Sequence, residues 1–406
     1  MSLPAQSVRS PAHGRSALRD ALAAAAEDTV VYDLDGIGRQ YSALCSELPG
    51  ALVRFAMKAC PVDEVLGHLA RLGSGFDAAS PQEIAQALRT GVAPELIHYG
   101  NTVKSDRDIV RAHRLGVRDF ATDSPQDVAA IAAHAPGARV FCRIATSGAG
   151  ALWGLSRKFG CAPEDVPSVL GAARDAGLVP SGLSVHVGSQ QMTAGAWAEA
   201  FDTLAASLEA LNRRGIVPDR INLGGGLPAL GVLDRRGRPL DPPLDGMFTV
   251  IRAGMERLRG LNAAPPAFLI EPGRHLVADH GAIRAHVARL TSRHRLDGTR
   301  EDWLYLSCGK FNGLYEMDQL QYRLEFPTHP AGPFTDAVVA GPTCDSDDAY
   351  APEGPVRVPR AISSGEPVWV HSCGAYAAAY ATAGFNGFTP LPYTCVGGAA
   401  PVGGGA

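Results

Sequence analysis

The stretch RINLGGGLP occupies Arg220–Pro228 and places three consecutive glycines directly after a short β-like run. Because glycine has no Cβ, the backbone of Gly224, Gly225 and Gly226 can approach an anion closely and point successive N–H groups at it. Farther along, residues 271–274 read EPGR, which offers a carboxylate for a cationic nitrogen and a guanidinium for a phosphate. A strand that opens into a ligand-binding loop at its carboxyl end is typical of α/β folds.

Pyridoxal 5′-phosphate (PLP) requires a partner for its ring nitrogen, a partner for its phosphate and a lysine for its aldehyde. The sequence also supplies the lysine. Residues 55–59 read FAMKA and place Lys58 at the end of an apolar run. Burying a lysine there for structural reasons alone is costly, and a partly desolvated amine is what Schiff-base chemistry uses. We therefore expect Lys58, the triple glycine and Glu271 with Arg274 to form a PLP site.

Eight β-like runs alternate with helical patterns, which predicts a (β/α)8 barrel. The runs cover residues 53–58, 75–79, 96–100, 119–122, 139–145, 182–188, 220–224 and 267–271. A doubly wound open sheet is the alternative, because strand order cannot be read from one sequence. Polar residues near the strand ends favour the barrel, and they are Lys58, Asp77, Asn101, Asp123, Arg143, His186, Gly224–Gly226 and Glu271.

The pattern changes after residue 282, where Val, Tyr and Phe runs are broken by Pro and Gly. Antiparallel strands are predicted over 303–307, 337–340 and 368–371, and residues 28–32 are also strand-like. The expected parts are 1–46, an N-terminal segment that contributes a strand to a β domain; 47–282, the PLP-binding barrel; 283–395, an all-β domain of sandwich or barrel-like form; and 396–406, a disordered tail.

Composition limits the classes of partner. The 406 residues carry a net charge of −4, which gives no basic field for nucleic acid, and no apolar run reaches the length of a membrane span. The first 15 residues lack the apolar core of a signal peptide, and the eight cysteines lack metal-type CxxC spacing. We expect a cytoplasmic protein with reduced thiols, no metal, and neither nucleic-acid nor membrane partners.

Each candidate residue also has a plainer explanation. His186 could be a satisfied core histidine, although its flat ring at a strand end could also stack on a planar cofactor. Glu271 and Arg274 could form a surface ion pair of little consequence. Residues 341–345 (GPTCD) could be a turn that holds a buried cysteine. The combination and order of the segments, rather than any one of them, favours a single site.

Taken in order, the segments resemble those of the fold-type III PLP-dependent decarboxylases, the ornithine/diaminopimelate/arginine decarboxylase superfamily, and are most similar to the bacterial ornithine/lysine branch. The resemblance extends over residues 32–391. It includes AMKA (56–59), GFDAAS (75–80), YGN (99–101), RIAT (143–146), SRKFG (156–160), HVGS (186–189), the triple glycine, EPGR (271–274), GPTCD (341–345), GAY (374–376) and GFNGF (384–388).

The resemblance implies roles for the residues around the cofactor. Lys58 would hold PLP as an internal aldimine, and Glu271 would keep the pyridine nitrogen protonated so that the ring acts as an electron sink. His186 would stack on the ring face, with Asp77 and Arg143 near the aldimine. The residues implied around the phosphate are Gly224, Gly225, Gly226, Arg274, Ser189 and Tyr376.

The resemblance also implies a homodimer with shared active sites. Cys344 of the partner subunit would protonate Cα after loss of carbon dioxide, and Asp345 of the partner subunit would bind the distal ammonium of the substrate. Lys158 and Asp348 would form an ion pair between the subunits. The substrate-binding residues within the pocket would be Tyr315, Glu316 and Tyr376.

We therefore expect decarboxylation of L-ornithine, L-lysine or a close analogue to the amine and carbon dioxide, through a quinonoid that Cys344 protonates. The order Cys344-Asp345-Ser346 supports this, because diaminopimelate decarboxylases usually show Cys-Glu-Ser there. Residues 307–311 read SCGKF where bacterial relatives commonly read DVGKF, and the wall after Glu316 is shorter. Asn222 also replaces a common Asp, which would alter a phosphate-side hydrogen bond. A modified diamino acid or a diaminopimelate-like substrate is therefore the alternative.

Two other functions remain. A racemase would need a base, usually a tyrosine, on the opposite face of the cofactor, whereas Cys344 favours protonation after decarboxylation. A non-catalytic relative that acts as a binding or regulatory protein would be expected to lose Lys58, Arg274 or Cys344, and all three are present.

Overall fold

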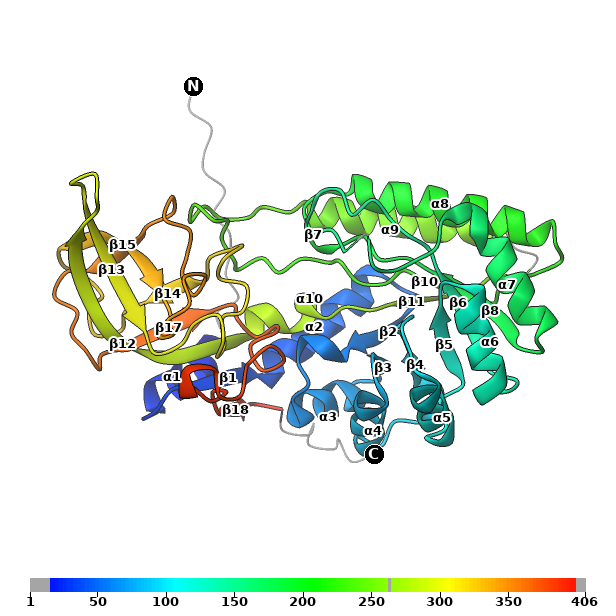
Figure 1. Ribbon diagram of the computed structural model, residues 1–406, viewed down its shortest axis with the longest axis horizontal. Helices are drawn as coiled ribbons and strands as arrows, with labels where there is room; N and C mark the ends of the chain where they lie inside the picture. Colours follow the sequence, from blue (N-terminus) through cyan, green and yellow to red (C-terminus); the bar gives the residue numbers. More distant parts are fainter. Residues whose placement is uncertain (1–14, 156, 262–263, 399–406) are drawn as a thin grey trace, which may run out of the picture.

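The computed structural model describes residues 15–155, 157–261 and 264–398. It has two bodies that lie side by side along the long axis of the molecule, a barrel on the right and a β domain on the left of Figure 1. The long strand β12 (Gly281–His294) leads from the barrel into the β domain.

The barrel is a closed ring of eight parallel strands, as predicted. Its strands are β2 (Ala51–Ala56), β3 (Gly75–Ala78), β4 (Ile97–Tyr99), β5 (Asp119–Thr122), β6 (Arg139–Arg143), β8 (Val179–Ser184), β10 (Arg220–Asn222) and β11 (Ala267–Ile270). They follow one another around the ring in this order, and β11 pairs with β2 to close it. A closed ring has no edge strand, so the doubly wound open sheet is excluded.

Helices cover the outside of the barrel (Figure 1). They are α2 (Leu34–Glu47), α3 (Asp63–Arg71), α4 (Pro81–Arg89), α5 (Asp106–Arg114), α6 (Pro125–His134), α7 (Val166–Asp175), α8 (Gly195–Asn212) and α9 (Leu244–Arg259). Three of them begin with the same chemistry, because the hydroxyls of Ser80, Ser105 and Ser124 each accept the N–H of the residue three positions on. These caps fix where each strand-to-helix loop ends.

The β domain draws strands from both ends of the chain. They are β1 (Thr29–Asp33), β12, β13 (Arg300–Leu306), β14 (Arg323–Glu325), β15 (Phe334–Ala340), β16 (Val356–Pro359), β17 (Pro367–His371) and β18 (Tyr393–Val396). The main order is β14–β17–β12–β13–β15–β16. Strand β1 joins it by pairing with β12, and α1 (Arg15–Ala24) packs on β1 and β12.

Two details of the β domain differ from the prediction. Antiparallel strands were predicted, but β13 pairs with β15, and β1 with β18, in parallel. Residues 307–333 are a connection long enough to return the chain to the same end of the sheet, as a parallel pair requires. The expected disordered tail also begins too early, since Val396 pairs with Asp33 in β18. The remainder of that tail, 399–406, lies outside the described residues.

A short antiparallel pair, β7 (Ala151–Trp153) and β9 (Ser189–Gln191), was not predicted. Three-residue strands show too little alternation to be recognised in a sequence. The pair sets Trp153 opposite Ser189 beyond the carboxyl end of β8. It therefore adds a wall to the end of the barrel where the candidate site lies.

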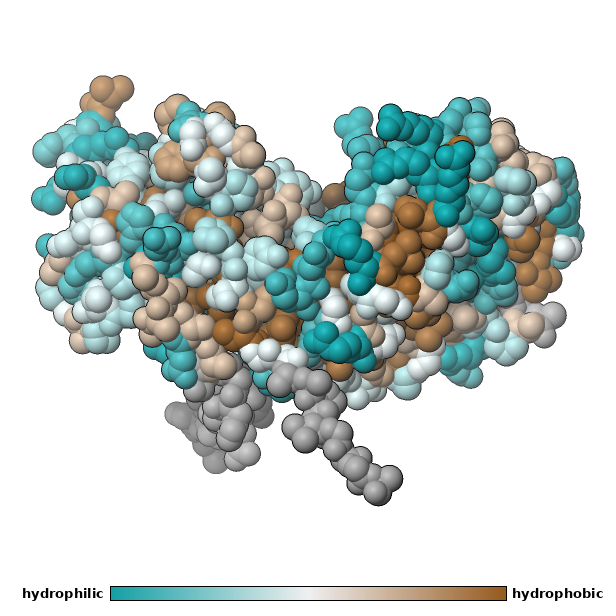
Figure 2. Space-filling model, turned by 90° about the horizontal axis from the view of Figure 1, so that it is seen from below, coloured by the Kyte–Doolittle hydropathy of each residue, from teal (hydrophilic) through white to brown (hydrophobic). Residues whose placement is uncertain are grey.

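One hydrophobic core extends through both bodies. It includes Phe55 and Phe76 of the barrel together with Val339 and Tyr350 of the β domain. Apolar residues are also visible at the surface where the two bodies meet (Figure 2). Within the described part of the chain, no helix is both long enough and apolar enough to cross a membrane.

Candidate active site

Lys58 lies on a single helical turn that follows β2. This turn, η1 (Met57–Ala59), buries Met57 and Ala59, whereas the Lys58 side chain is 47% exposed. Its Nζ donates to Oδ2 of Asp77 at 3.1 Å, and Asp77 lies on the neighbouring strand β3 with its side chain 7% exposed. The amine is therefore held at the carboxyl end of the barrel rather than within its core.

This contact changes the acid–base properties of both groups. Burial lowers the pKa of Lys58, but the charge of Asp77 outweighs burial and the pKa is raised above its usual value. Burial also acts to raise the pKa of Asp77, while Lys58 and His98 hold it well below its usual range. Both side chains are therefore charged at neutral pH in the cofactor-free chain.

Glu271 directly follows β11. Its Oε1 accepts a hydrogen bond from Nδ2 of Asn222 at 2.5 Å, and its backbone N–H donates to Gly224 at 2.8 Å. Asn222 uses its other amide atom, Oδ1, to accept the N–H of Gly224 at 2.9 Å. Asn222 therefore links Glu271 to the start of the glycine loop.

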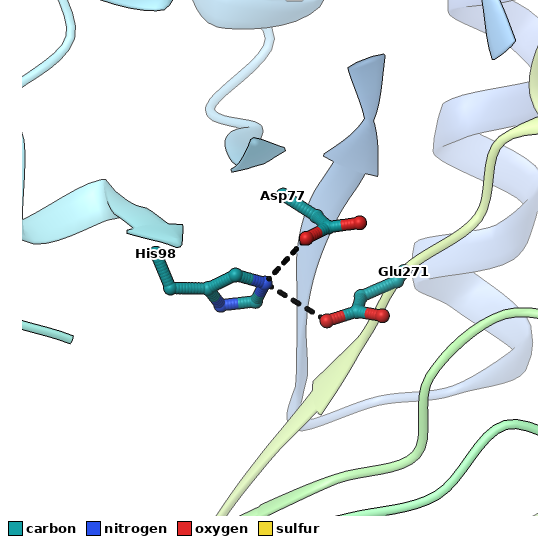
Figure 3. Close-up of side chains that lie close together, drawn as sticks. All are labelled: Asp77, His98 and Glu271. Atoms are coloured by element: carbon teal, nitrogen blue, oxygen red, sulfur yellow. Dashed lines mark ion pairs between the residues drawn. The ribbon is translucent and has the colours of Figure 1, made fainter. Parts of the chain in front are cut away.

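His98 is a site residue that the sequence reasoning missed. It lies on β4, is 1% exposed, and its Nε2 is 2.8 Å from Oε1 of Glu271 and 3.2 Å from Oδ1 of Asp77 (Figure 3). The detectable signal was a polar residue between Ile97 and Tyr99, where strand alternation turns it away from its apolar neighbours. The prediction used only residues at the strand ends.

The triple glycine forms a tight loop that no other residue type would fit. Gly224 has a φ of +67°, and a Cβ there would lie 2.0 Å from the carbonyl oxygen of Val185. A Cβ on Gly225 would lie 2.8 Å from the carbonyl oxygen of Glu271, and Gly226 has a φ of +129°. The loop backbone is therefore packed directly against neighbouring strand ends, which excludes side chains at these positions.

His186 follows β8 and lies against this loop. Its Nδ1 accepts the N–H of Gly188 at 3.0 Å, so the ring proton is on Nε2. Burial, together with the charges of Arg143 and Lys58, lowers the pKa of His186 to about 3. The imidazole is therefore neutral at physiological pH, and its flat ring is suited to packing on a planar ligand.

Arg143 ends β6 and faces the same region. Burial lowers the pKa of its guanidinium, while Glu271 and Asp77 oppose that shift. Its Cζ lies 4.9 Å from the ring of Phe159, in the SRKFG segment. Arg143 is therefore close enough to Glu271 and Asp77 for their negative charges to stabilise its guanidinium.

Arg274 begins the short helix α10 (Arg274–Val277) and is 5% exposed. Its Nη2 and Nε donate to Oγ of Ser189 at 3.2 and 3.3 Å. The rings of Trp153 and Tyr376 lie 4.8 and 4.9 Å from its Cζ. The side chains predicted around the phosphate are thus brought together, with Trp153 as an additional neighbour.

Glu316 was expected to bind substrate, but the structure pairs it with Arg274. The two guanidinium nitrogens Nη1 and Nη2 donate to its carboxylate at 2.6 and 2.5 Å, a bidentate contact in which the Glu316 side chain is only 8% exposed. The same pair occupies Nη1 and Nη2 of Arg274, so it bears equally on the expected substrate contact of Glu316 and the expected phosphate contact of Arg274. Its neighbour Tyr315 is 40% exposed and stacks on Tyr380, a residue that was not predicted, at 4.0 Å.

Tyr376 joins the β domain to the lysine segment. Its N–H donates to the carbonyl oxygen of Ala59 at 2.7 Å, and its φ is +66°. A left-handed conformation is strained for a tyrosine and persists only where the surroundings enforce it, which is common at functional sites. This contact ties the GAY segment to the turn that carries Lys58.

Cys344 and Asp345 lie on a loop of the β domain, away from these contacts. Cys344 is exposed, and its N–H donates to Oδ1 of Asn386 at 2.9 Å. The carboxylate of Asp345 accepts the N–H of Asp347 at 2.8 Å. Among the described residues of this single chain, neither side chain hydrogen-bonds to Lys58.

Asp348 does not suit the expected ion pair between subunits. It is 2% exposed, and its carboxylate accepts the N–H of Lys310 at 2.7 Å and the N–H and hydroxyl of Thr343 at 3.0 and 2.6 Å. In this conformation Asp348 stabilises its own loop and presents no surface to Lys158 of the partner subunit.

Comparison with known proteins identifies the family. Residues 34–278 match the family described as pyridoxal-dependent decarboxylase, pyridoxal binding domain. This chain belongs to that family. The pyridoxal-dependent decarboxylase is an enzyme of the carboxy-lyase class, and its cofactor is PLP.

Individual relatives cover most of the chain. The decarboxylase is 32% identical over 373 residues to the lysine/ornithine decarboxylase of Selenomonas ruminantium, which covers 89% of this chain and 88% of the relative. It is also 32% identical over 364 residues to the diaminopimelate decarboxylase of Pseudomonas fluorescens, covering 86% and 82%. The crystal structure of an SrLDC mutant in complex with PLP has a TM-score of 0.82 at 30% identity, covering 93% of this chain and 94% of that chain.

The residues of the site fit PLP. They provide an amine at the barrel mouth, a carboxylate at the end of β11, a loop of three glycines after β10 with its backbone free of side chains, and a buried guanidinium beside Ser189. All four lie at the carboxyl ends of strands, where barrel enzymes collect their active sites.

Proposed function

We propose that this decarboxylase removes the α-carboxyl group of L-ornithine, L-lysine or a close analogue, as a homodimer with shared active sites. The observation that carries the proposal is the connected set Lys58, Asp77, His98 and Glu271 at the mouth of the barrel. This set links an amine suited to the aldehyde of PLP with a carboxylate suited to its pyridine nitrogen.

The chain offers a partner for each polar group of the cofactor. Lys58 would hold the aldehyde carbon, Glu271 the ring nitrogen, and Gly224–Gly226 with Arg274 and Ser189 the phosphate. When bound, PLP supplies an electron sink for the electron pair left as the bond to the carboxylate breaks. Glu271 favours a proton on the ring nitrogen and so maintains that property.

Decarboxylation leaves a carbon that must receive a proton. His186 is a poor donor because its pKa is lowered to about 3 by burial and by nearby positive charges. Cys344 is exposed on its own chain, and this exposure supports a role in the site of a second subunit. We assign the proton to the thiol of Cys344 of the partner subunit.

The preference for a basic substrate rests on a carboxylate. Glu316 is already neutralised by Arg274 within a buried bidentate pair. Asp345, which follows Cys344, is the remaining candidate to bind the distal ammonium, again from the partner subunit. A neutral substrate would leave that carboxylate desolvated without a partner, which disfavours it.

The test is mass-spectrometric detection of amine products from the PLP-loaded enzyme. The panel contains L- and D-ornithine, lysine, arginine, diaminopimelate and 2,4-diaminobutyrate, and a Lys58→Ala variant serves as the control for uncatalysed loss. Putrescine or cadaverine from the L-amino acids, absent with the control, is the expected result.

Two other outcomes count against this substrate assignment. Turnover of diaminopimelate alone would favour a second candidate, a diaminopimelate-like substrate, for which the 32% identity to the Pseudomonas fluorescens enzyme is the supporting observation. No product from the whole panel, with cofactor bound, would contradict the basic amino-acid assignment and point to a modified diamino acid.

A further inference from the structure

His98 stands between the two carboxylates that matter most in the site. Its Nε2 and one oxygen each of Asp77 and Glu271 lie within 4.8 Å of one another, and His98 itself is 1% exposed (Figure 3). The other oxygen of Asp77 accepts from Lys58 at 3.1 Å. His98 therefore connects the lysine end of the site to the glutamate end.

The contacts of Glu271 with His98 and Asn222 use only its Oε1 and leave Oε2 for another partner. Both His98 and the amide of Asn222 approach the same atom, Oε1, at 2.8 and 2.5 Å. A carboxylate has two oxygens, so these contacts fix its rotation while Oε2 stays available. An outer donor that orients an inner ligand in this way commonly sets how well that ligand works.

The charge balance gives His98 a second effect. Two carboxylates this close would disfavour each other's ionised form, and one of them would take up a proton unless a positive or donor group lay between them. Besides Lys58, the charged groups that face this pair are Arg143 from β6 and Arg54 from β2, whose pKa values respond to both carboxylates. His98 is the group that lies within 3.2 Å of both.

Burial lowers the pKa of His98, but the contacts with Asp77 and Glu271 outweigh burial and raise it. The ring of Phe141 lies 5.2 Å away and offers no competing acceptor. His98 Nε2 is thus a buried nitrogen within ion-pair distance of both carboxylates but without hydrogen-bond geometry to either, and the raised pKa favours a protonated, cationic ring there. A metal ion held by His98, Asp77 and Glu271 is disfavoured, because the ammonium of Lys58 already supplies a positive charge at the other oxygen of Asp77.

We propose that His98 is a positioning residue whose cationic ring lies between Glu271 and Asp77, keeps both carboxylates ionised, and directs the second oxygen of Glu271 to the ring nitrogen of PLP. The inference rests on the proposed roles of Glu271 and Lys58. It predicts that His98 governs the affinity for PLP and the electronic state of the bound cofactor, without contact with the substrate.

The test compares His98→Phe with His98→Gln. Phenylalanine fills the space but removes the donor, whereas glutamine places an amide N–H near the position of Nε2 without the charge. The readouts are the Kd of PLP from absorbance titration of cofactor-free enzyme, and the position and pH dependence of the absorbance band of bound PLP. His68→Leu, at another buried histidine outside the site, is the control.

We expect His98→Phe to weaken PLP binding about tenfold or more, because the two buried carboxylates lose the positive charge between them, and to move the absorbance band or its pH transition. His98→Gln should lie between Phe and wild type, and His68→Leu should match wild type. A folded His98→Phe with unchanged Kd and spectrum would overturn the proposal. So would a His98→Gln that is as impaired as His98→Phe.

A double-mutant cycle covers the case in which His98→Phe does not fold. In a Glu271→Gln background, His98→Gln should have much less effect on the spectrum than in wild type, because its action passes through Glu271. Equal effects in both backgrounds would overturn the proposal. A wild-type chain that does not bind PLP would instead defeat the proposed function, so the two failures can be told apart.

Discussion

At the scale of single residues, Asp77 is a buried carboxylate that its basic neighbours keep ionised in the cofactor-free chain. Its two oxygens face Lys58 and His98 at 3.1 and 3.2 Å, and its side chain is 7% exposed. Because these neighbours lower its pKa, Asp77 contributes stability above its usual pKa, and that contribution is lost as the pH falls through the lowered value.

We expect cofactor-free Asp77→Asn to be less stable than wild type at pH 7 by about 1–2 kcal/mol, a modest value because Lys58 is half exposed. The difference should shrink between about pH 5 and pH 2, where wild type loses the contribution of Asp77. Urea denaturation at pH 7 and pH 3 measures this difference in the free energy of unfolding. Asp175→Asn, on the exposed end of α7, is the control. A difference that is equal at both pH values would contradict the assignment.

At the scale of elements, strand positions were predictable while their side-chain partners were not. All eight barrel strands overlap the predicted runs, because continuous apolar stretches bounded by glycines and caps are local features. The parallel pairing of β13 with β15 and the short β7–β9 pair depend on distant segments. His98 was missed for the same reason, since its partners come from β3 and from the end of β11.

The loop after β10 gives a prediction with a matched control. Gly224 and Gly215 have φ values of +67° and +68°, but a Cβ would meet the carbonyl oxygen of Val185 at 2.0 Å at position 224 and nothing within 4 Å at position 215. Gly215→Ala should therefore lose only about 1–2 kcal/mol of stability, the conformational cost of a Cβ in the left-handed region, and should bind PLP normally. Gly224→Ala should lose more stability and bind PLP weakly, as thermal melts and absorbance titration would show. Equal behaviour of the two variants would mean that the loop tolerates side chains.

At the scale of the whole molecule, the β domain and the barrel share one hydrophobic core within a chain but hold different parts of the proposed chemistry. Tyr376 reaches Ala59 of its own barrel, whereas Cys344 is exposed on the β domain. A shared-site dimer would bring Cys344 of the partner subunit to Lys58. This arrangement has a numerical consequence when inactive subunits are mixed.

We expect Lys58→Ala and Cys344→Ala to be inactive alone, and an equal mixture to recover about a quarter of native activity. Random assortment makes half of the dimers mixed, and each mixed dimer has one site with both native residues. Amine formation after co-refolding measures it, with mixed dimers verified by differently tagged subunits. Absence of recovery in verified mixed dimers would rule out the shared site.

The order of the motifs along the chain was enough to predict a barrel and PLP chemistry, and to predict a site around Lys58, Glu271 and Gly224–Gly226. Strand ends and glycine loops carry their chemistry within a few consecutive residues, so these features are visible without partners. The folded chain was needed to find that His98 lies between Asp77 and Glu271, and that Glu316 pairs with Arg274. The physical reason is that these buried polar groups come from segments far apart in the sequence. They meet only because the barrel closes and the β domain packs against it, and local periodicity contains no information about such distant contacts.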